Sequence, residues 1–182
     1  MLKNLIATIS LLIIFGFNIY AQDKCNIYSE PSVGVTLCAP QKWTVLKKEG
    51  EPFADIFGEI NKGQTPNINM RIAYIAVSLS EYVDGASDFI LKNQGRLGIT
   101  NVKVKNRSDF VASIKGIRVV YDAEVNEMNL RVIQYYFKGL GEAKIILTAT
   151  LPLSNADELE KVVDESFKTF KVDNKPIRIG TK

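Results

Sequence analysis

The strict alternation of side chains over residues 117–125 constrains the fold of this chain more than any other feature. The odd positions of this stretch are apolar, and most of the even positions are charged. The apolar members are Ile117, Val119, Tyr121, Ala123 and Val125, and the charged members are Arg118, Asp122 and Glu124. Successive side chains of a β-strand point to opposite faces of its sheet. The stretch therefore predicts a strand with one buried face.

Several other segments show the same period of two. They cover residues 33–37, 43–46, 54–60, 67–77, 100–112, 130–138 and 142–151. In residues 67–77 the alternation places Ile68, Met70, Ile72 and Tyr74 on one face. Turn residues separate the later strands: residues 113–116 and 126–129 form turns, and the glycines of Gly139-Leu-Gly141 indicate a hairpin. Strands joined by short turns predict an antiparallel sheet.

Two segments have a helical period instead. The stripe of the first, over residues 78–97, contains Leu79, Tyr82, Val83, Ala86, Phe89, Ile90 and Leu97. Ser78 and Glu81 form a capping-box pattern at its start. The second helix, over residues 154–170, has the stripe Ala156, Leu159, Val163, Phe167 and Phe170, and we expect Ser154 and Asp157 to cap it.

These patterns predict an α+β fold, an antiparallel sheet with helices packed on it. Val120, Ile133 and Ile146 interrupt the more polar face of the sheet, so we expect its second side to be covered in part. The expected organisation is one domain over residues 22–172, followed by a polar C-terminal tail over residues 173–182.

Residues 1–21 predict a secretory signal peptide. Lys3 precedes an apolar run from Leu5 to Phe17, and Ala21 offers a small residue at the cleavage point. A membrane anchor would need a longer apolar run, of about 20 residues. A lipid-modified Cys25 would need small residues before it, where Lys24 stands. We therefore expect an exported protein, periplasmic or extracellular and soluble, with no membrane span after cleavage.

The two cysteines, Cys25 and Cys38, follow the predicted signal peptide. Thiols that reach an oxidising compartment pair, so export and an even count predict a disulfide between them. A redox-active pair is the alternative, but its usual C-x-x-C spacing is not present.

The composition excludes several classes of function. With 23 basic and 20 acidic residues the formal net charge is +3, and no basic stripe indicates nucleic-acid binding. The chain has no histidine, which removes Ser–His and Cys–His nucleophilic pairs. No phosphate-binding loop or metal-ligand spacing occurs. We predict no enzymatic activity, no cofactor and no metal.

Carboxylates remain as possible acid–base groups. Asp84 and Asp88 lie one helical turn apart, and Asp122 and Glu124 share a strand face. A hydrolase that uses carboxylates alone would need two of them close together in a cleft. Solvated surface charge is the simpler interpretation of both pairs.

Aromatic residues provide the candidates for a binding surface. The run Tyr135-Tyr136-Phe137 must place side chains on both faces of its strand. Its tyrosines, Tyr135 and Tyr136, are one candidate surface, although strands favour aromatic residues for packing as well. Phe53 and Phe57 are the other, in the glycine- and proline-rich region of residues 47–66.

Over residues 33–172 the order of these elements resembles the PsbP-like family, the extrinsic photosystem II protein and its non-photosynthetic bacterial relatives. The segments that carry the likeness are Val35-Thr-Leu-Cys-Ala-Pro-Gln-Lys-Trp43, Pro66-Asn-Ile-Asn-Met70 with Leu79-Ser-Glu-Tyr82, Ile114-Lys-Gly116 with Arg118–Tyr121 and Gln134-Tyr-Tyr136, and Lys144–Thr150 with Ser166-Phe167. The resemblance implies an α/β/α sandwich and a mostly non-enzymatic role in binding or stabilising larger assemblies.

Two functions remain open from the sequence. The first is an exported accessory domain that docks on a larger envelope or secreted protein. The alternative is a carrier of a small apolar ligand held between the sheet and a helix. An enclosed apolar cavity would favour the carrier, and a solid core with an exposed apolar patch would favour docking.

Overall fold

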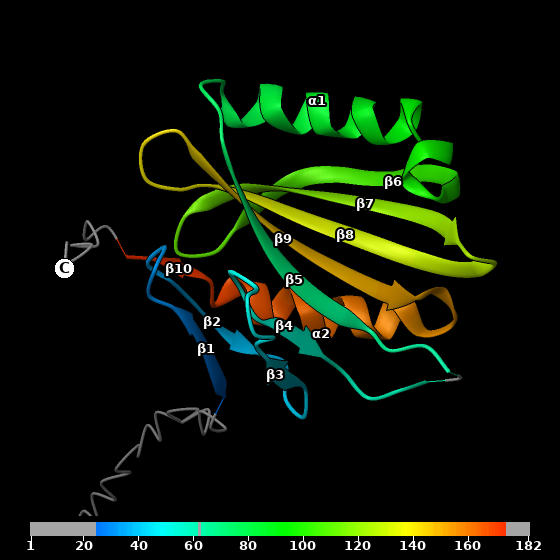
Figure 1. The fold of residues 1–182 in the computed structure, drawn as a ribbon, viewed down its shortest axis with the longest axis horizontal. Helices are drawn as coiled ribbons and strands as arrows, with labels where there is room; N and C mark the ends of the chain where they lie inside the picture. The colour runs from blue at the N-terminus through cyan, green and yellow to red at the C-terminus, as the bar shows by residue number, and fades with distance from the viewer. Residues whose placement is uncertain (1–24, 62, 174–182) are drawn as a thin grey trace, which may run out of the picture.

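A computed structural model describes residues 25–61 and 63–173 of the chain (Figure 1). The predicted signal peptide and almost all of the predicted tail lie outside these residues. Among the described residues, no helix has the length and apolar character that crossing a membrane requires.

The core of the fold is a seven-stranded sheet whose neighbouring strands are all antiparallel, in the order β3-β4-β5-β9-β8-β7-β6. Its strands are β3 (Thr44–Leu46), β4 (Asp55–Phe57), β5 (Asn67–Tyr74), β6 (Ile99–Val111), β7 (Lys115–Val125), β8 (Met128–Lys138) and β9 (Ala143–Pro152). A second sheet has three strands in the order β1-β2-β10, namely β1 (Asn26–Glu30), β2 (Val35–Ala39) and β10 (Lys171–Val172).

The helices α1 (Leu79–Lys92) and α2 (Ala156–Lys168) lie on opposite faces of the large sheet (Figure 1). The α2 face holds the larger core, in which Val163 and Phe167 pack with Ile133, Tyr135 and Leu147. On the other face Val83 of α1 packs against a smaller cluster, formed by Val119, Tyr121, Tyr136 and Ile146. The predicted α+β fold with helices packed on an antiparallel sheet is confirmed.

The first helix is shorter than the sequence indicates. The predicted capping box is present: Ser78 Oγ accepts the Glu81 N–H at 3.2 Å, and Glu81 accepts the Ser78 N–H at 2.9 Å. At the other end the Asn93 side chain donates to the Phe89 carbonyl at 2.8 Å. A short 3₁₀ turn, Gly95–Leu97, follows and leaves Leu97 exposed. The helical pattern therefore extends past the point where the helix ends.

The expected caps of the second helix are wrong. Ser154 lies in a 3₁₀ turn, Leu153–Asn155, and the N-cap residue Asn155 makes no side-chain capping bond. Asp157 instead pairs with Arg131 of β8, at 2.5 Å. Arg131 offers the Asp157 carboxylate a full positive charge, which the backbone amides at the start of the helix lack.

The two short strands β1 and β10 were not predicted from the sequence. They flank β2, and the predicted bridge between Cys25 and Cys38 joins the start of β1 to β2, with a Cα–Cα distance of 5.3 Å. The backbone of Cys38 is tied to the end of α2, because its N–H donates to Thr169 Oγ1 at 2.8 Å and its carbonyl accepts from Ser166 Oγ at 2.5 Å. The bridge therefore anchors the small sheet beside the larger core.

The β7–β8 hairpin turn supplies a stability prediction. Its two central residues, Asn126 and Glu127, have positive φ of 47° and 64°. A residue other than glycine loses about 1–2 kcal/mol of stability in the left-handed conformation. Glycine avoids this strain, but ordering its more flexible backbone costs roughly 0.5–1 kcal/mol. We expect Glu127→Gly to raise the free energy of unfolding by about 0.5–1 kcal/mol in urea titrations. An unchanged or lower midpoint would contradict this account of the turn.

Glu30 supplies a prediction about acid stability. Burial alone would raise the pKa of its carboxyl, but hydrogen bonds from Ser32 and Lys47 outweigh burial and lower the pKa below its ordinary value. A carboxyl whose folded pKa is depressed stabilises the protein above its unfolded pKa, and that contribution is lost as the pH falls through the folded value. Glu30→Gln should therefore destabilise the protein near pH 7 and destabilise it by less near pH 3. Urea titrations that show the same loss at both pH values would refute this linkage.

Candidate functional site

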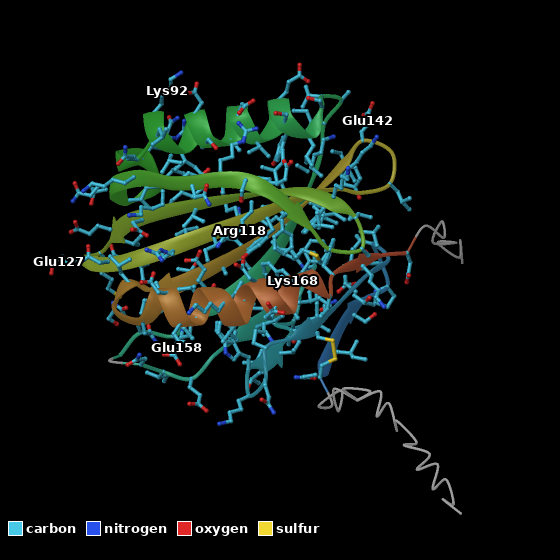
Figure 2. The ribbon with its side chains drawn as sticks, turned by 180° about the vertical axis from the view of Figure 1, so that it is seen from behind. Lys92, Arg118, Glu127, Glu142, Glu158 and Lys168 are labelled. Carbon is cyan, nitrogen blue, oxygen red and sulfur yellow. A yellow bond between two sulfur atoms is a disulfide. The ribbon has the colours of Figure 1, made fainter. Side chains whose placement is uncertain are left out.

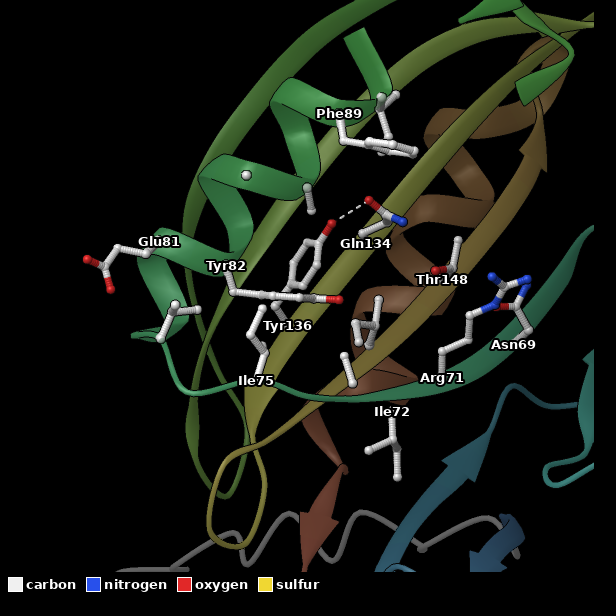
Figure 3. Close-up of a pocket in the computed structure, with 16 residues that line it drawn as sticks. Asn69, Arg71, Ile72, Ile75, Glu81, Tyr82, Phe89, Gln134, Tyr136 and Thr148 are labelled. Carbon is white, nitrogen blue, oxygen red and sulfur yellow. Dashed lines mark hydrogen bonds between the residues drawn. The ribbon is translucent and has the colours of Figure 1, made fainter. Parts of the chain in front are cut away.

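An open groove lies between α1 and the part of the large sheet that this helix leaves uncovered (Figure 3). The main contacts of the helix are with β7 and β8, and the groove opens over β5 and β9 on this face (Figure 1). The groove has a volume of about 770 Å³. Volumes of this order are typical of small-molecule sites.

The floor of the groove is uncharged. Tyr136 is only 1% exposed; it meets the ring of Tyr82 edge to face at a centroid distance of 6.0 Å and donates its hydroxyl to Gln134 Oε1 at 2.5 Å. Burial raises the pKa of the Tyr136 hydroxyl, which therefore stays protonated. Ile146 and Thr148 of β9 continue the floor.

The helix wall of the groove is apolar. It is formed by Tyr82, Ala86, Phe89 and Ile90, with Gly85 between them. The prediction that Phe89 belongs to the buried stripe is wrong, since this side chain is 51% exposed. The ring lies at the groove, where the helix overhangs open space, and Figure 3 shows it on the α1 side of that space.

Polar residues form the wall opposite the helix. Asn69 and Arg71 project from β5, as Figure 3 shows. Arg71 is the only cation among the residues that line the groove, and within the described residues its side chain makes no ion pair and no hydrogen bond. The lining also contains one carboxylate, Glu81, which accepts the Ser78 N–H in the capping box of α1.

A second depression, which we call the β5 trough, lies beside β5 and has a volume of about 530 Å³. It is bounded by β5 and by residues 48–55, and Asn69, Arg71 and Ile72 border both the trough and the groove. Phe53, one of the predicted surface aromatics, lines the trough. Phe57 is half-buried in β4 and borders neither depression.

The predicted pair Tyr135 and Tyr136 is divided between the two faces of the sheet. Tyr135 is fully buried on the α2 face and donates its hydroxyl to Asp164. Arg118 lies over its ring, with Cζ 5.6 Å from the centroid. Tyr135 is therefore a core residue and not part of a binding surface, whereas Tyr136 borders the groove.

Arg118 is the centre of an ionic network between the sheet and α2 (Figure 2). It pairs with Glu160 and, at 3.0 Å, with Asp164. Burial alone would lower the pKa of Arg118, but the hydrogen bonds and negative charges around it raise the pKa further above its ordinary value. Arg131 extends the network to Asp122 at 2.9 Å and to Glu160 at 2.9 Å. These charges link α2 to the sheet beside the apolar core.

The four candidate carboxylates are not gathered in one cleft: Asp84 and Asp88 border a surface depression beside α1, and Asp122 and Glu124 do not line it. Asp84 pairs with Arg107, Asp88 with Lys92, and Asp122 with Arg131, while Glu124 accepts a hydrogen bond from Asn101 at 2.7 Å. Each carboxylate therefore has a structural partner. Across residues 25–61 and 63–173, no group of three or more Cys, Asp or Glu side chains is arranged to hold a metal ion.

Sequence reasoning missed the groove, although its aromatic floor residue was a candidate. The signal that could have indicated it is Gly85, a glycine inside a strongly amphipathic helical pattern. The position of the uncovered sheet face depends on where α1 crosses the sheet, which residue periodicity does not specify.

No protein-family model matches the sequence, and no curated protein matches it. Solved structures do match its fold. Cyanobacterial PsbP from Synechocystis is 15% identical, covers 81% of this chain and 91% of its own, and has a TM-score of 0.57. LpqN, involved in cell envelope biogenesis of Mycobacterium tuberculosis, is 12% identical over 83% of this chain and 86% of its own, with a TM-score of 0.59.

A Pseudomonas aeruginosa protein of unknown function is also similar, with 11% identity, coverage of 74% of this chain and 98% of its own, and a TM-score of 0.55. Likeness at these identities is a likeness of fold. The resemblance found in the sequence is confirmed at that level, and this chain has the PsbP-like fold.

Proposed function

We propose that this protein is an exported, non-catalytic binding domain whose groove between α1 and the sheet holds a small apolar or amphiphilic ligand. The observation that carries the proposal is the groove itself, which is open to solvent and not an enclosed cavity, and which therefore suits a ligand that keeps one side in water. It combines about 770 Å³ of space, an uncharged floor and a half-exposed phenylalanine on its helix wall. An apolar ligand would remove from water the surface that Phe89 and Ile90 now present to it.

Gly85 supports this proposal. Glycine inside a helix costs about 0.5–1 kcal/mol relative to alanine. A Cβ at this position would meet nothing within 4 Å, so packing within the described protein does not require glycine here. Gly85 is exposed at the rim of the groove and also borders a depression on the other side of α1, so the absence of a side chain leaves this rim clear. We infer that Gly85 is retained for the space that it leaves to a ligand.

Docking on a larger protein is the second function that we propose. It is supported by exposed apolar residues at the end of β5 and in the connection to α1, where Tyr74 is 76%, Ile75 42% and Val77 39% exposed. These side chains lie beside the groove, and Ile75 and Val77 also line it. A carrier that transfers its ligand to a partner would use both surfaces.

Export is part of the proposal. The signal-peptide pattern and the Cys25–Cys38 bridge agree with an oxidising compartment. The similar fold of LpqN, which takes part in envelope biogenesis, is compatible with the same setting.

The groove can be tested with the neutral fluorescent probe 1-N-phenylnaphthylamine and the oxidised protein without residues 1–21. We expect saturable enhancement of the dye's fluorescence. Gly85→Trp should weaken binding by about tenfold or more, because the indole would occupy the groove. Lys92→Trp adds the same ring to the same helix outside the groove and should leave binding unchanged. Equal binding by both variants, or no binding by the parent protein, would overturn the ligand function.

A further inference from the structure

The described part of the large sheet ends at β3 and β6, and a further free edge lies along β5. It exists because β4 pairs with β5 only at Asn67 and Ile68, whereas β9 pairs with all of β5. The outer side of β5 is therefore open over residues 69–74. Figure 1 shows β3 and β4 beside only one end of β5.

The backbone groups on this open side can be assigned. The Pro66 carbonyl accepts from the Gly58 N–H on the β4 side at 2.9 Å, while the Ile75 N–H donates to the Glu142 carbonyl on the β9 side at 3.3 Å. The N–H and C=O of one strand residue point to the same side, and the side alternates along the strand. Met70, Ile72 and Tyr74 therefore direct both groups to the open side. Within the described residues no other backbone group bonds to them there.

The edge at β6 carries protection that β5 lacks. The register of β6 against β7 shifts twice, between Thr100 and Lys103 and between Val104 and Asn106. Lysine and arginine side chains recur along it, at Lys103, Lys105 and Arg107. Irregular register and charge are the usual devices that prevent an edge from pairing with another chain. By contrast, β5 pairs in unbroken register with β9 and ends in an exposed tyrosine.

The β5 trough provides room for a strand at this edge. Its volume of about 530 Å³ lies between residues 48–55 and the middle of β5. Side chains of an added strand would alternate between the two faces of the sheet. On the α1 face they would lie beside Arg71, and on the other face beside Phe53, which packs against the large core.

We propose that β5 accepts an extended segment of a partner polypeptide as an added strand, through the backbone groups of Ile72 and Tyr74. The segment carries a carboxylate beside Arg71 and an apolar side chain beside Phe53. Backbone pairing supplies affinity in such complexes, and flanking pockets for alternate side chains supply specificity. This inference rests on the docking function proposed above and specifies the chemistry of the partner.

Selection of random dodecapeptides displayed on phage against the oxidised protein without residues 1–21 tests the proposal. We expect enriched peptides to alternate apolar and polar residues, with an acidic residue among the polar ones. A synthetic peptide of the enriched sequence should slow hydrogen exchange at the amides of Ile72 and Tyr74. No enrichment, or protection confined to amides other than those of Met70, Ile72 and Tyr74, would overturn the proposal.

Two variants separate the backbone interaction from side-chain contact. Tyr74→Pro removes the N–H on the open side without touching a bond to β9, and should weaken peptide binding by about tenfold. Tyr74→Thr keeps the N–H and should bind the peptide within about threefold of the parent protein. Equal loss in both variants would contradict strand addition. Gly85→Trp should leave peptide binding intact, and Tyr74→Pro should leave binding of 1-N-phenylnaphthylamine intact. Failure of ligand binding in the groove can therefore be distinguished from failure of strand addition at β5.

Discussion

Phe167→Ala is expected to lower the free energy of unfolding by about 4 kcal/mol. Phe167 is fully buried on α2, and its ring lies edge-on to Tyr135 with centroids 4.4 Å apart. Truncation would remove that contact and leave a cavity at the centre of the α2 face, where the strands around it are too rigid to collapse into the space. Guanidinium titration of the oxidised protein measures the loss.

The matched control is the same substitution on the other helix. Phe89→Ala removes a half-exposed ring from the wall of the groove, and should change the free energy of unfolding by no more than about 0.5 kcal/mol. It should nevertheless weaken the binding of 1-N-phenylnaphthylamine. Similar losses of stability in both variants would mean that the α1 wall is core and not a binding surface.

Arg118→Ala is expected to destabilise the protein by about 3 kcal/mol. The guanidinium is the buried partner of Glu160 and Asp164, and its removal leaves negative charge at the interface between the sheet and α2. Arg131 still neutralises part of the charge on Glu160, which keeps the loss below that of a fully isolated pair. Urea titrations give the change in stability.

An exposed ion pair provides the comparison. Lys92 and Asp88 pair at 2.5 Å on the surface of α1, with side chains that are 71% and 60% exposed. Lys92→Ala should therefore cost no more than about 0.5 kcal/mol. If Arg118→Ala cost as little as Lys92→Ala, the network would not contribute to holding α2 on the sheet.

Periodicity predicted the large elements because burial of one face dominates their energetics. The alternating residues 117–125 lie in β7, and the stripe that includes Val163 and Phe167 forms the buried face of α2. It failed where a tertiary contact replaced a local one. Asp157 is available for capping by sequence, but Arg131, distant in sequence, pairs with it.

The candidate site was less predictable than the fold. Phe89 fits the buried stripe by period, yet whether it meets the sheet or open space depends on the crossing of α1 over β7 and β8. The open edge of β5 depends on where β4 stops pairing, which the short strand at Asp55–Phe57 determines. Tyr135 and Tyr136 differ because the two faces of β8 pack against different helices. The sequence does not specify which helix covers which face.

The location of a bound ligand tests the central claim most directly. Intermolecular nuclear Overhauser effects can be recorded between bound 1-N-phenylnaphthylamine and the methyl groups of the isotope-labelled, oxidised protein. We predict contacts from the dye to Ile90 of α1 and to Ile146 of β9, which line the helix wall and the floor of the groove. Contacts to methyl groups of the α2 face, such as Val163 and Leu147, with none to Ile90 or Ile146, would contradict the claim that this groove is the binding site.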